Sequence, residues 1–171
     1  DGSSIPEMLD EQVAAVLINH VDYRSGTLCD MGNLTRQVQE FGGLAVWDLS
    51  HSAGIFPVQL NRCRVDFAVG CTYKYLNGGP GAPAYLYAAS RHHAACNQPL
   101  SGWFGHARPF DFERHFNPDS GIRRFVCGTQ PILSLRALQS GLEIYQDVSL
   151  QQVREKSMAL TDLFIKLLKN E

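Results

Sequence analysis

The sequence predicts an α/β fold built on a mostly parallel sheet, and three patterns support this prediction. Four short, mainly apolar runs are typical of buried strands. A segment with apolar residues at helical spacing lies between the first two runs, and two more such segments follow near the C-terminal end. Strand, helix, strand, loop and strand in this order favour parallel pairing in the first part of the sheet.

The expected strands are short and cover residues 13–18, 44–47, 65–69 and 84–87. In open α/β sheets, functional groups gather at the carboxyl ends of the strands. Asp48 directly follows the second expected strand, and residues 71–75 follow the third. These two positions are therefore the first candidates for a functional site.

Three helices are expected, over residues 31–41, 131–145 and 150–168. The first should end at Gly42, because glycine adopts the left-handed conformation of a helix C-cap without strain. Between the last strand and the second helix, residues 89–130 have little periodicity and predict a long irregular region. The first strand has almost nothing before it, and the apolar stripe of the last helix has no partner downstream. We therefore expect the sequence to be part of a larger protein.

The composition is that of a globular protein and narrows the classes of partner. A net charge of −2 without a dense basic block argues against nucleic acid. Five cysteines without a C-x-x-C pair argue against a disulfide framework and a zinc site, and favour a reducing cytoplasm. No apolar stretch reaches the length of a membrane helix. The four histidines within residues 89–130 have no regular spacing that would gather them around a metal, so no metal is expected.

Lys74 stands out because the other three lysines lie in or directly after the last expected helix, whereas Lys74 lies in an apolar, glycine-rich run. A lysine at a strand end beside small residues can approach a planar ligand, and a surface loop lysine is the plain alternative. Asp48, at the end of the preceding strand, can cap a following helix or meet a cation. Together the two residues fit pyridoxal 5'-phosphate (PLP), with Asp48 at the pyridine nitrogen and Lys74 at the aldehyde carbon.

Four runs carry a more specific resemblance. They are VWDLSHSAG (46–54), FAVGCTYKYLNGGPGAPA (67–84), LSGWFGH (100–106) and CGTQPILSL (127–135). In order, and across nearly the whole chain, these runs resemble kynureninases, which belong to the class V aminotransferase superfamily of fold type I PLP enzymes. An Asp followed by a Lys is shared across the superfamily and indicates only the cofactor, whereas YKYLNGGPG and GWFGH are particular to kynureninases.

The resemblance implies a role for each matching residue. Lys74 would form the Schiff base, Asp48 would pair with the pyridine nitrogen, and His51 would lie in the same cofactor site. Tyr73 would bond to the cofactor phosphate and pass protons. Two further residues would reach the phosphate from the neighbouring subunit of a homodimer, namely Trp103 and Thr129. Residues 1–145 would form part of the PLP-binding large domain, and residues 146–171 a helix leading toward a C-terminal small domain.

Plain structural alternatives accompany several of these roles. His51 could be a loop histidine with satisfied hydrogen bonds, Trp103 a loop anchor bonded to backbone, and Thr129 a helix cap before Pro131. The loop after the first strand, with His20 and Asp22, has a family counterpart near the cofactor. Many kynureninases have Asn where this chain has Asp22, however, and a turn role for this residue is the alternative.

The implied reaction is the hydrolysis of L-kynurenine or 3-hydroxykynurenine to L-alanine and the corresponding anthranilate. Lys74, displaced from the aldehyde by substrate, would remove the α proton, and Tyr73 would carry protons in later steps. The family's phosphate cup, ring-stacking residue and carboxylate-binding arginine lie in segments outside these 171 residues. We therefore expect the isolated chain to be inactive or barely active.

Two alternative functions remain open at the level of sequence. Another class V PLP enzyme, a cysteine desulfurase or an aminotransferase, would keep Asp48 and Lys74, although the GWFGH run argues against desulfuration. A non-catalytic folding or dimerisation segment would form dimers without binding PLP. Release of alanine from kynurenine or from cysteine distinguishes a kynureninase from a cysteine desulfurase. Binding of PLP distinguishes either enzyme from a non-catalytic segment.

Overall fold

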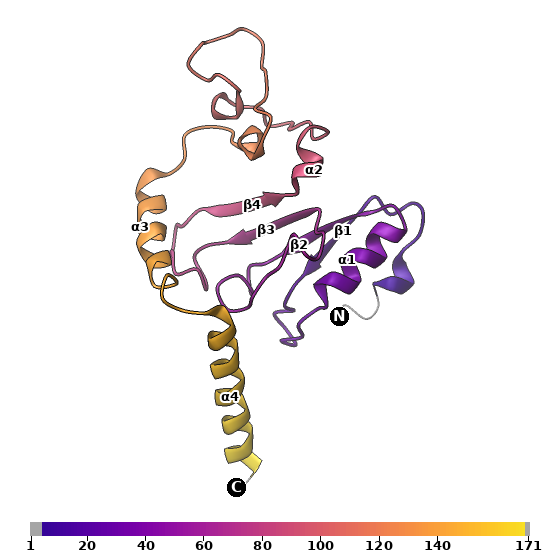
Figure 1. Ribbon diagram of the computed structural model, residues 1–171, viewed down its shortest axis with the longest axis vertical. Coiled ribbons are helices and arrows are strands. Elements are labelled where there is room, and N and C mark those ends of the chain that lie inside the picture. Colours follow the sequence, from indigo (N-terminus) through magenta and orange to yellow (C-terminus); the bar gives the residue numbers. More distant parts are fainter. Residues whose placement is uncertain (1–4, 170–171) are drawn as a thin grey trace.

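A four-stranded mixed sheet forms the centre of the structure, a computed structural model that describes residues 5–169 (Figure 1). Strands β1 to β3 run parallel, and β4 pairs antiparallel with β3. The bounds, in the order in which the strands lie side by side, are β1 (Ala15–Asn19), β2 (Leu44–Asp48), β3 (Phe67–Cys71) and β4 (Ala84–Ala88). The predicted sheet, parallel in its first part, is confirmed, and each strand lies within two residues of its predicted bounds.

Helix α1 (Met31–Glu40) covers one face of this sheet. It begins at Asp30, whose side chain accepts a hydrogen bond from the backbone N–H of Asn33. It ends in a Schellman motif: Gly42 has a φ of +80°, and the N–H of Gly43 donates to the carbonyl of Val38. The predicted helix and its glycine stop are therefore confirmed.

The core lies between α1 and the sheet. Trp47 is fully buried, and its indole N–H donates to the hydroxyl of Thr35 on α1 at 2.9 Å. Side chains alternate between the two faces of a strand, so that Ile18 points into this core while Leu17 points to the other face, where it is 68% exposed. The prediction that residues 13–18 form a buried strand is therefore wrong for the face of the sheet that carries Leu17, because α1 covers only the opposite face.

The second half of the chain is mostly irregular before it becomes helical. After β4 come α2 (Ser90–His93) and two single 3-10 turns, η3 (Trp103–Gly105) and η4 (Ile122–Phe125), which confirms the expected irregular region. Helices α3 (Ile132–Glu143) and α4 (Leu150–Lys169) follow, with α4 extending away from the sheet and burying none of its described residues (Figure 1). One more 3-10 turn, η2 (Pro6–Met8), precedes β1. None of the described helices is long and apolar enough to cross a membrane.

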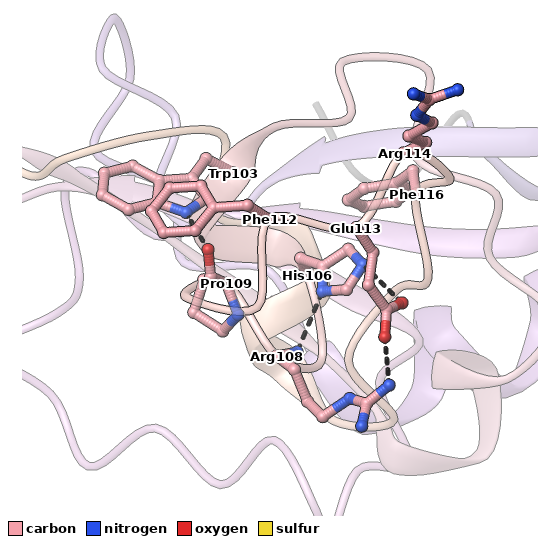
Figure 2. A pocket seen from close by; sticks show the side chains of 8 residues that line it. All are labelled: Trp103, His106, Arg108, Pro109, Phe112, Glu113, Arg114 and Phe116. Atoms are coloured by element: carbon pink, nitrogen blue, oxygen red, sulfur yellow. Dashed lines mark hydrogen bonds and ion pairs between the residues drawn. The ribbon is translucent and has the colours of Figure 1, made fainter.

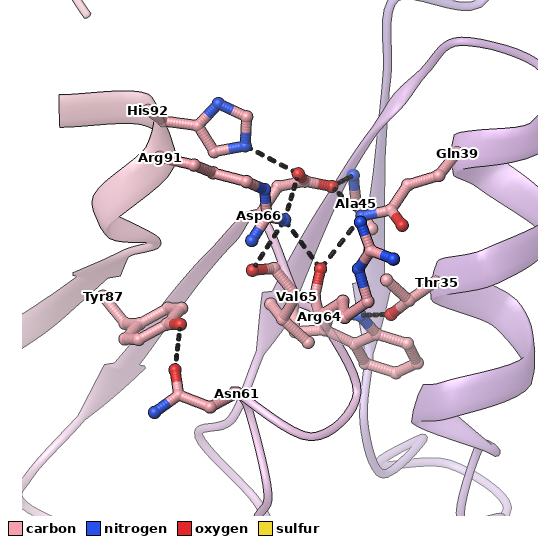
Figure 3. Close-up of polar contacts among 11 residues, drawn as sticks. Thr35, Gln39, Ala45, Asn61, Arg64, Val65, Asp66, Tyr87, Arg91 and His92 are labelled. Carbon is pink, nitrogen blue, oxygen red and sulfur yellow. Dashed lines mark hydrogen bonds and ion pairs between the residues drawn. The ribbon is translucent and has the colours of Figure 1, made fainter. Parts of the chain in front are cut away.

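Asp66, just before β3, joins three other elements at the edge of the sheet opposite the strands' carboxyl ends (Figure 3). Its carboxylate accepts hydrogen bonds from Gln39 of α1 and the Ala45 N–H of β2, each at 2.9 Å. It also accepts from Arg91 at 2.6 Å and His92 at 2.7 Å, both in α2. Burial alone raises the pKa of Asp66, but the hydrogen bonds from these four partners outweigh burial and lower it to about 2.

Candidate cofactor site

The candidate site residues lie at the carboxyl ends of two adjacent parallel strands. Asp48 ends β2 and is in register with Val69 of β3, so the loops that follow the two strands leave the sheet side by side. His51 lies in the first loop, and Tyr73 and Lys74 lie in the second. These residues lie near one another because the carboxyl ends of neighbouring parallel strands meet at the same edge of the sheet.

Lys74 and His51 are in direct contact. The Lys74 amine nitrogen Nζ lies 3.1 Å from Nε2 of the His51 ring, and both side chains are half-buried. Nζ also lies 5.4 Å from the centre of the Tyr73 ring, in the range of a cation–π contact. The structure therefore brings these three predicted residues together, and the partner of the His51 ring is the lysine itself.

Asp48 uses one of its two carboxylate oxygens locally. Oδ1 accepts a hydrogen bond from the backbone N–H of Ser50 at 2.7 Å and so closes a turn; none of the described residues between β2 and β3 forms a helix, so the helix-cap alternative for Asp48 is wrong. Oδ2 makes no hydrogen bond within residues 5–169, and the side chain is half-buried. One oxygen thus steadies the turn after β2, while the other is available to a cationic partner.

Glycine allows the two loops to approach each other. Gly54, in the loop after β2, has a φ of +96°, and a Cβ placed on it would lie 2.4 Å from the carbonyl oxygen of Tyr75. The Tyr145 hydroxyl donates to the same Tyr75 carbonyl, and it accepts a hydrogen bond from the Asn77 side chain at 3.2 Å. Tyr145, just after α3, thereby anchors the loop that carries Lys74.

The sequence reasoning gave no role to Gly54 or Tyr145. Gly54 ends the run VWDLSHSAG. A glycine at such a position, after a strand and a turn, can indicate that another segment of backbone lies close by. Tyr145 lies 70 residues from Tyr75, its hydrogen-bond acceptor. No local pattern could have predicted that contact.

His20 and Asp22, which follow β1, have different surroundings. The His20 ring is buried with its edge toward Trp47 and Phe56, at centroid distances of 5.7 and 6.3 Å. Its Nδ1 atom has no hydrogen-bond partner among the described residues, and burial lowers the pKa of the ring. Asp22 accepts two backbone hydrogen bonds, from Ser25 and Arg24, which lower its pKa. This is the turn role that was the alternative for Asp22.

Trp103 lies in a separate part of the chain, in η3 (Figure 2). Its indole N–H donates to the carbonyl of Pro109, and its ring packs against Phe110 and Phe112. It lines a pocket with His106, Arg108 and other residues of the irregular region, to which Lys74 and its neighbours do not contribute. Within one chain, Trp103 therefore has the loop-anchor arrangement that was its structural alternative.

Thr129 is exposed and lies three positions before Ile132, the first residue of α3. The N-cap of α3 is Pro131, and no side chain caps this helix. The alternative of a helix cap is therefore wrong for Thr129. No described contact joins Thr129 or Trp103 to Lys74 within the chain.

Comparisons with known proteins identify the family of the chain. The family model of class-V aminotransferases matches residues 1–171. The chain is similar to kynureninase from Burkholderia mallei (strain SAVP1), with 49% identity over 170 residues, which is 99% of this chain and 41% of that protein. It is also 48% identical to kynureninase from Pseudomonas fluorescens over 163 residues, 95% of this chain and 39% of that protein. The chain therefore spans about two-fifths of the length of these relatives.

Two solved structures share the fold. Cysteine desulfurase CsdA from Escherichia coli matches with a TM-score of 0.79 at 20% identity, over 100% of this chain and 42% of that chain. The apo cysteine desulfurase from Thermococcus onnurineus NA1 matches with the same TM-score of 0.79 at 21% identity, over 99% of this chain and 42% of that one. At such identities the likeness concerns the fold alone. With the family model matching from end to end, the chain belongs to the class-V aminotransferase family.

Proposed function

We propose that the protein carrying this chain is a kynureninase, a PLP-dependent hydrolase that converts L-kynurenine or 3-hydroxykynurenine to L-alanine and the corresponding anthranilate. The observation that carries the proposal is the placement of Asp48 and Lys74 at the carboxyl ends of adjacent parallel strands, with the lysine amine 3.1 Å from His51. The similarity to kynureninases at 49% identity over 99% of the chain supports this choice within the class-V family.

The side chains at this edge of the sheet fit PLP, the cofactor of the class-V family. Lys74 offers an amine for the cofactor aldehyde, and Oδ2 of Asp48, which has no partner among residues 5–169, offers a negative charge for a protonated pyridine nitrogen. His51 and Tyr73 lie beside the amine, within reach of a ring held there. Bound PLP would supply the electron sink that stabilises a carbanion formed from the substrate.

The residues of the chain would then position groups and move protons. Asp48 would hold the proton on the pyridine nitrogen. Lys74, released from the cofactor by substrate, would act as the general base that takes the α proton. Tyr73 is 49% exposed and lies beside Nζ, so its hydroxyl can carry protons between solvent and the reacting groups.

The proposal includes a homodimer in which two exposed side chains, Trp103 and Thr129, serve the phosphate site of the neighbouring subunit. Residues 1–145 would belong to the large domain, and residues 146–171, with the exposed α4, would lead toward a small domain. The five free cysteines suit a reducing compartment, and we place the reaction in the cytoplasm.

Covalent trapping tests the cofactor assignment. The longest natural polypeptide that carries these residues is mixed with PLP, reduced with borohydride and digested for mass spectrometry. The added mass is expected on the peptide with Lys74, to vanish in Lys74→Arg, and to persist in the control Lys156→Arg, since Lys156 lies on exposed α4. Trapping on another lysine, or none at all, contradicts the assignment.

The substrate is tested separately on the same polypeptide. Alanine release is measured from L-kynurenine, 3-hydroxykynurenine and L-cysteine. Release from either kynurenine and none from cysteine supports the proposal. Release from cysteine alone would instead assign the protein to the desulfurases, whose fold it shares.

A further inference from the structure

The contact between His51 and Lys74 bears on how the lysine becomes reactive. A primary amine attacks a carbonyl carbon only after it has lost its extra proton. An ordinary lysine side chain, with a pKa of about 10.4, is an ammonium group at neutral pH. A lysine that must join an aldehyde therefore needs a group that takes its proton away.

The surroundings of Lys74 offer one such group. Within residues 5–169, Lys74 makes no salt bridge, and its one hydrogen-bonding partner is Nε2 of His51 at 3.1 Å. Tyr73, a second titratable group, presents its ring to Nζ at 5.4 Å. A separation of 3.1 Å is hydrogen-bonding distance, so an N–H of the amine can point at Nε2 when that ring nitrogen carries no proton.

The ring of His51 also has a second nitrogen that can pass the proton on. Nδ1 makes no hydrogen bond to the described residues and is not among their buried unpartnered atoms, so it is open to solvent. The loop that carries His51 is held against the Lys74 loop by the close packing of Gly54 on Tyr75. The packing of the two loops therefore keeps His51 and Lys74 together.

We propose that His51 is the proton acceptor that prepares Lys74 for reaction. The ammonium N–H bond of Lys74 breaks, its electron pair stays on Nζ, and an N–H bond forms at Nε2 of His51. The proton on Nδ1 then leaves to water, which restores the neutral imidazole. The free electron pair of Nζ attacks the aldehyde carbon. The inference rests on the proposed function, in which Lys74 joins the cofactor, but the proton step belongs to the protein alone.

Competitive labelling of the cofactor-free protein tests the proposal. A trace of acetic anhydride is added between pH 6 and 10.5, and mass spectrometry compares labelling of Lys74 with that of Lys156, an exposed reference in the same chain. His51→Gln keeps a polar side chain near the Nε2 position but cannot accept a proton. Relative labelling of Lys74 at pH 7 should fall about tenfold in His51→Gln and equal that of wild type at pH 10.5.

Two results would overturn the proposal. Equal pH profiles in the wild type and in His51→Gln would mean that His51 does not take the proton. Slower labelling in His51→Gln at every pH, including 10.5, would mean that His51 governs access to the amine instead. Unchanged labelling of Lys156 and an unchanged circular dichroism spectrum report that the variant is folded, and His51→Asn serves as a second variant if it is not.

Cofactor trapping separates this inference from the proposed function. At pH 10.5, PLP and borohydride should label Lys74 in both the wild type and His51→Gln, because hydroxide in the solvent then takes the proton in place of His51. At pH 7 the variant should trap PLP about tenfold more slowly. If PLP is trapped at no pH in either protein, the proposed function fails, while the acetic anhydride profile still decides the role of His51.

Discussion

Gly54 packs so tightly against Tyr75 that a Cβ on the glycine would lie 2.4 Å from the tyrosine carbonyl oxygen. The two residues belong to the loops that carry His51 and Lys74, which follow different strands. No side chain fits between them. The distance between the His51 ring and the Lys74 amine therefore depends on a glycine three residues after the histidine.

Replacing Gly54 with alanine is expected to separate the two loops. The added methyl group would meet backbone atoms, which cannot rotate away, and the φ of +96° adds strain. Gly42→Ala is the matched control, because Gly42 has a φ of +80° but open space around its Cβ position. The control should lose about 1 kcal/mol in urea unfolding and still trap PLP on Lys74. Gly54→Ala should lose more stability and trap less PLP, and equal behaviour of the two variants would contradict this role.

The sequence was informative about this site because the strands that position Asp48 and Lys74 can be recognised from short stretches of sequence. Asp48 and Lys74 each follow an apolar strand run, and parallel strands bring such ends together without further information. The contact of His51 with Lys74 and the packing of Gly54 on Tyr75 depend on loop conformation. Loop conformation is set by long-range packing, which periodicity does not encode.

Two features of the fold also escaped the sequence. The antiparallel direction of β4 depends on a tight connection closed by hydrogen bonds such as that from the Gly78 N–H to the Thr72 carbonyl, at 2.9 Å. Asp66 lies in the run that was predicted as a buried strand, and a charged residue there was a signal of buried polar partners. Its partners come from α1, β2 and α2, which only the folded chain brings together.

Asp66 is expected to contribute stability that depends on acid pH. Its pKa is lowered from 3.8 to about 2, so the folded state favours the charged form. This contribution is complete above pH 3.8 and is lost as the pH falls toward about 2. Asp66→Asn should lower the free energy of unfolding by about 2 kcal/mol at pH 7 and flatten its decline below pH 4.

Urea unfolding at a series of pH values measures this effect in the wild type and in Asp66→Asn. Asp147→Asn is the control, because Asp147 is exposed and makes no hydrogen bond or salt bridge within the described residues. Its profile should follow that of the wild type. If Asp66→Asn keeps the full loss of stability between pH 4 and 2, the acid dependence has another source.

Trp103 is expected to act across the dimer. Trp103→Phe keeps an aromatic ring for Phe110 and Phe112 but removes the indole N–H, and should weaken phosphate binding by about 1.5–3 kcal/mol. In mixed dimers of Trp103→Phe and Lys74→Ala subunits, one site would combine native Lys74 with native Trp103. Kynurenine turnover should therefore reappear on mixing.

The control for subunit mixing uses Asp48, which lies beside the Lys74 loop in the same chain. Mixed dimers of Asp48→Asn and Lys74→Ala subunits should remain inactive, because no site then holds both native residues. No rescue with Trp103→Phe would mean that Trp103 serves its own subunit, whereas rescue in the control would mean that Asp48 and Lys74 do not serve one site. Without rescue of Trp103→Phe, the role of Trp103 would be the anchor on Pro109.

His20 is expected to make stability depend on pH in a different window from Asp66. Burial lowers its pKa below 6.5, so the unfolded chain binds a proton more readily than the folded one. The contribution of neutral His20 is complete above pH 6.5 and is lost as the pH falls below this value.

His20→Leu keeps an apolar body against Trp47 and removes the unpartnered Nδ1 atom. The variant should match the wild type at pH 8 and exceed it at pH 5 in urea unfolding, because an apolar replacement has no proton to bind. His115→Leu, at an exposed position, should leave the pH profile unchanged. A wild-type stability that is flat between pH 6.5 and 5 would mean that the His20 ring is protonated without disturbing its packing on Trp47 and Phe56.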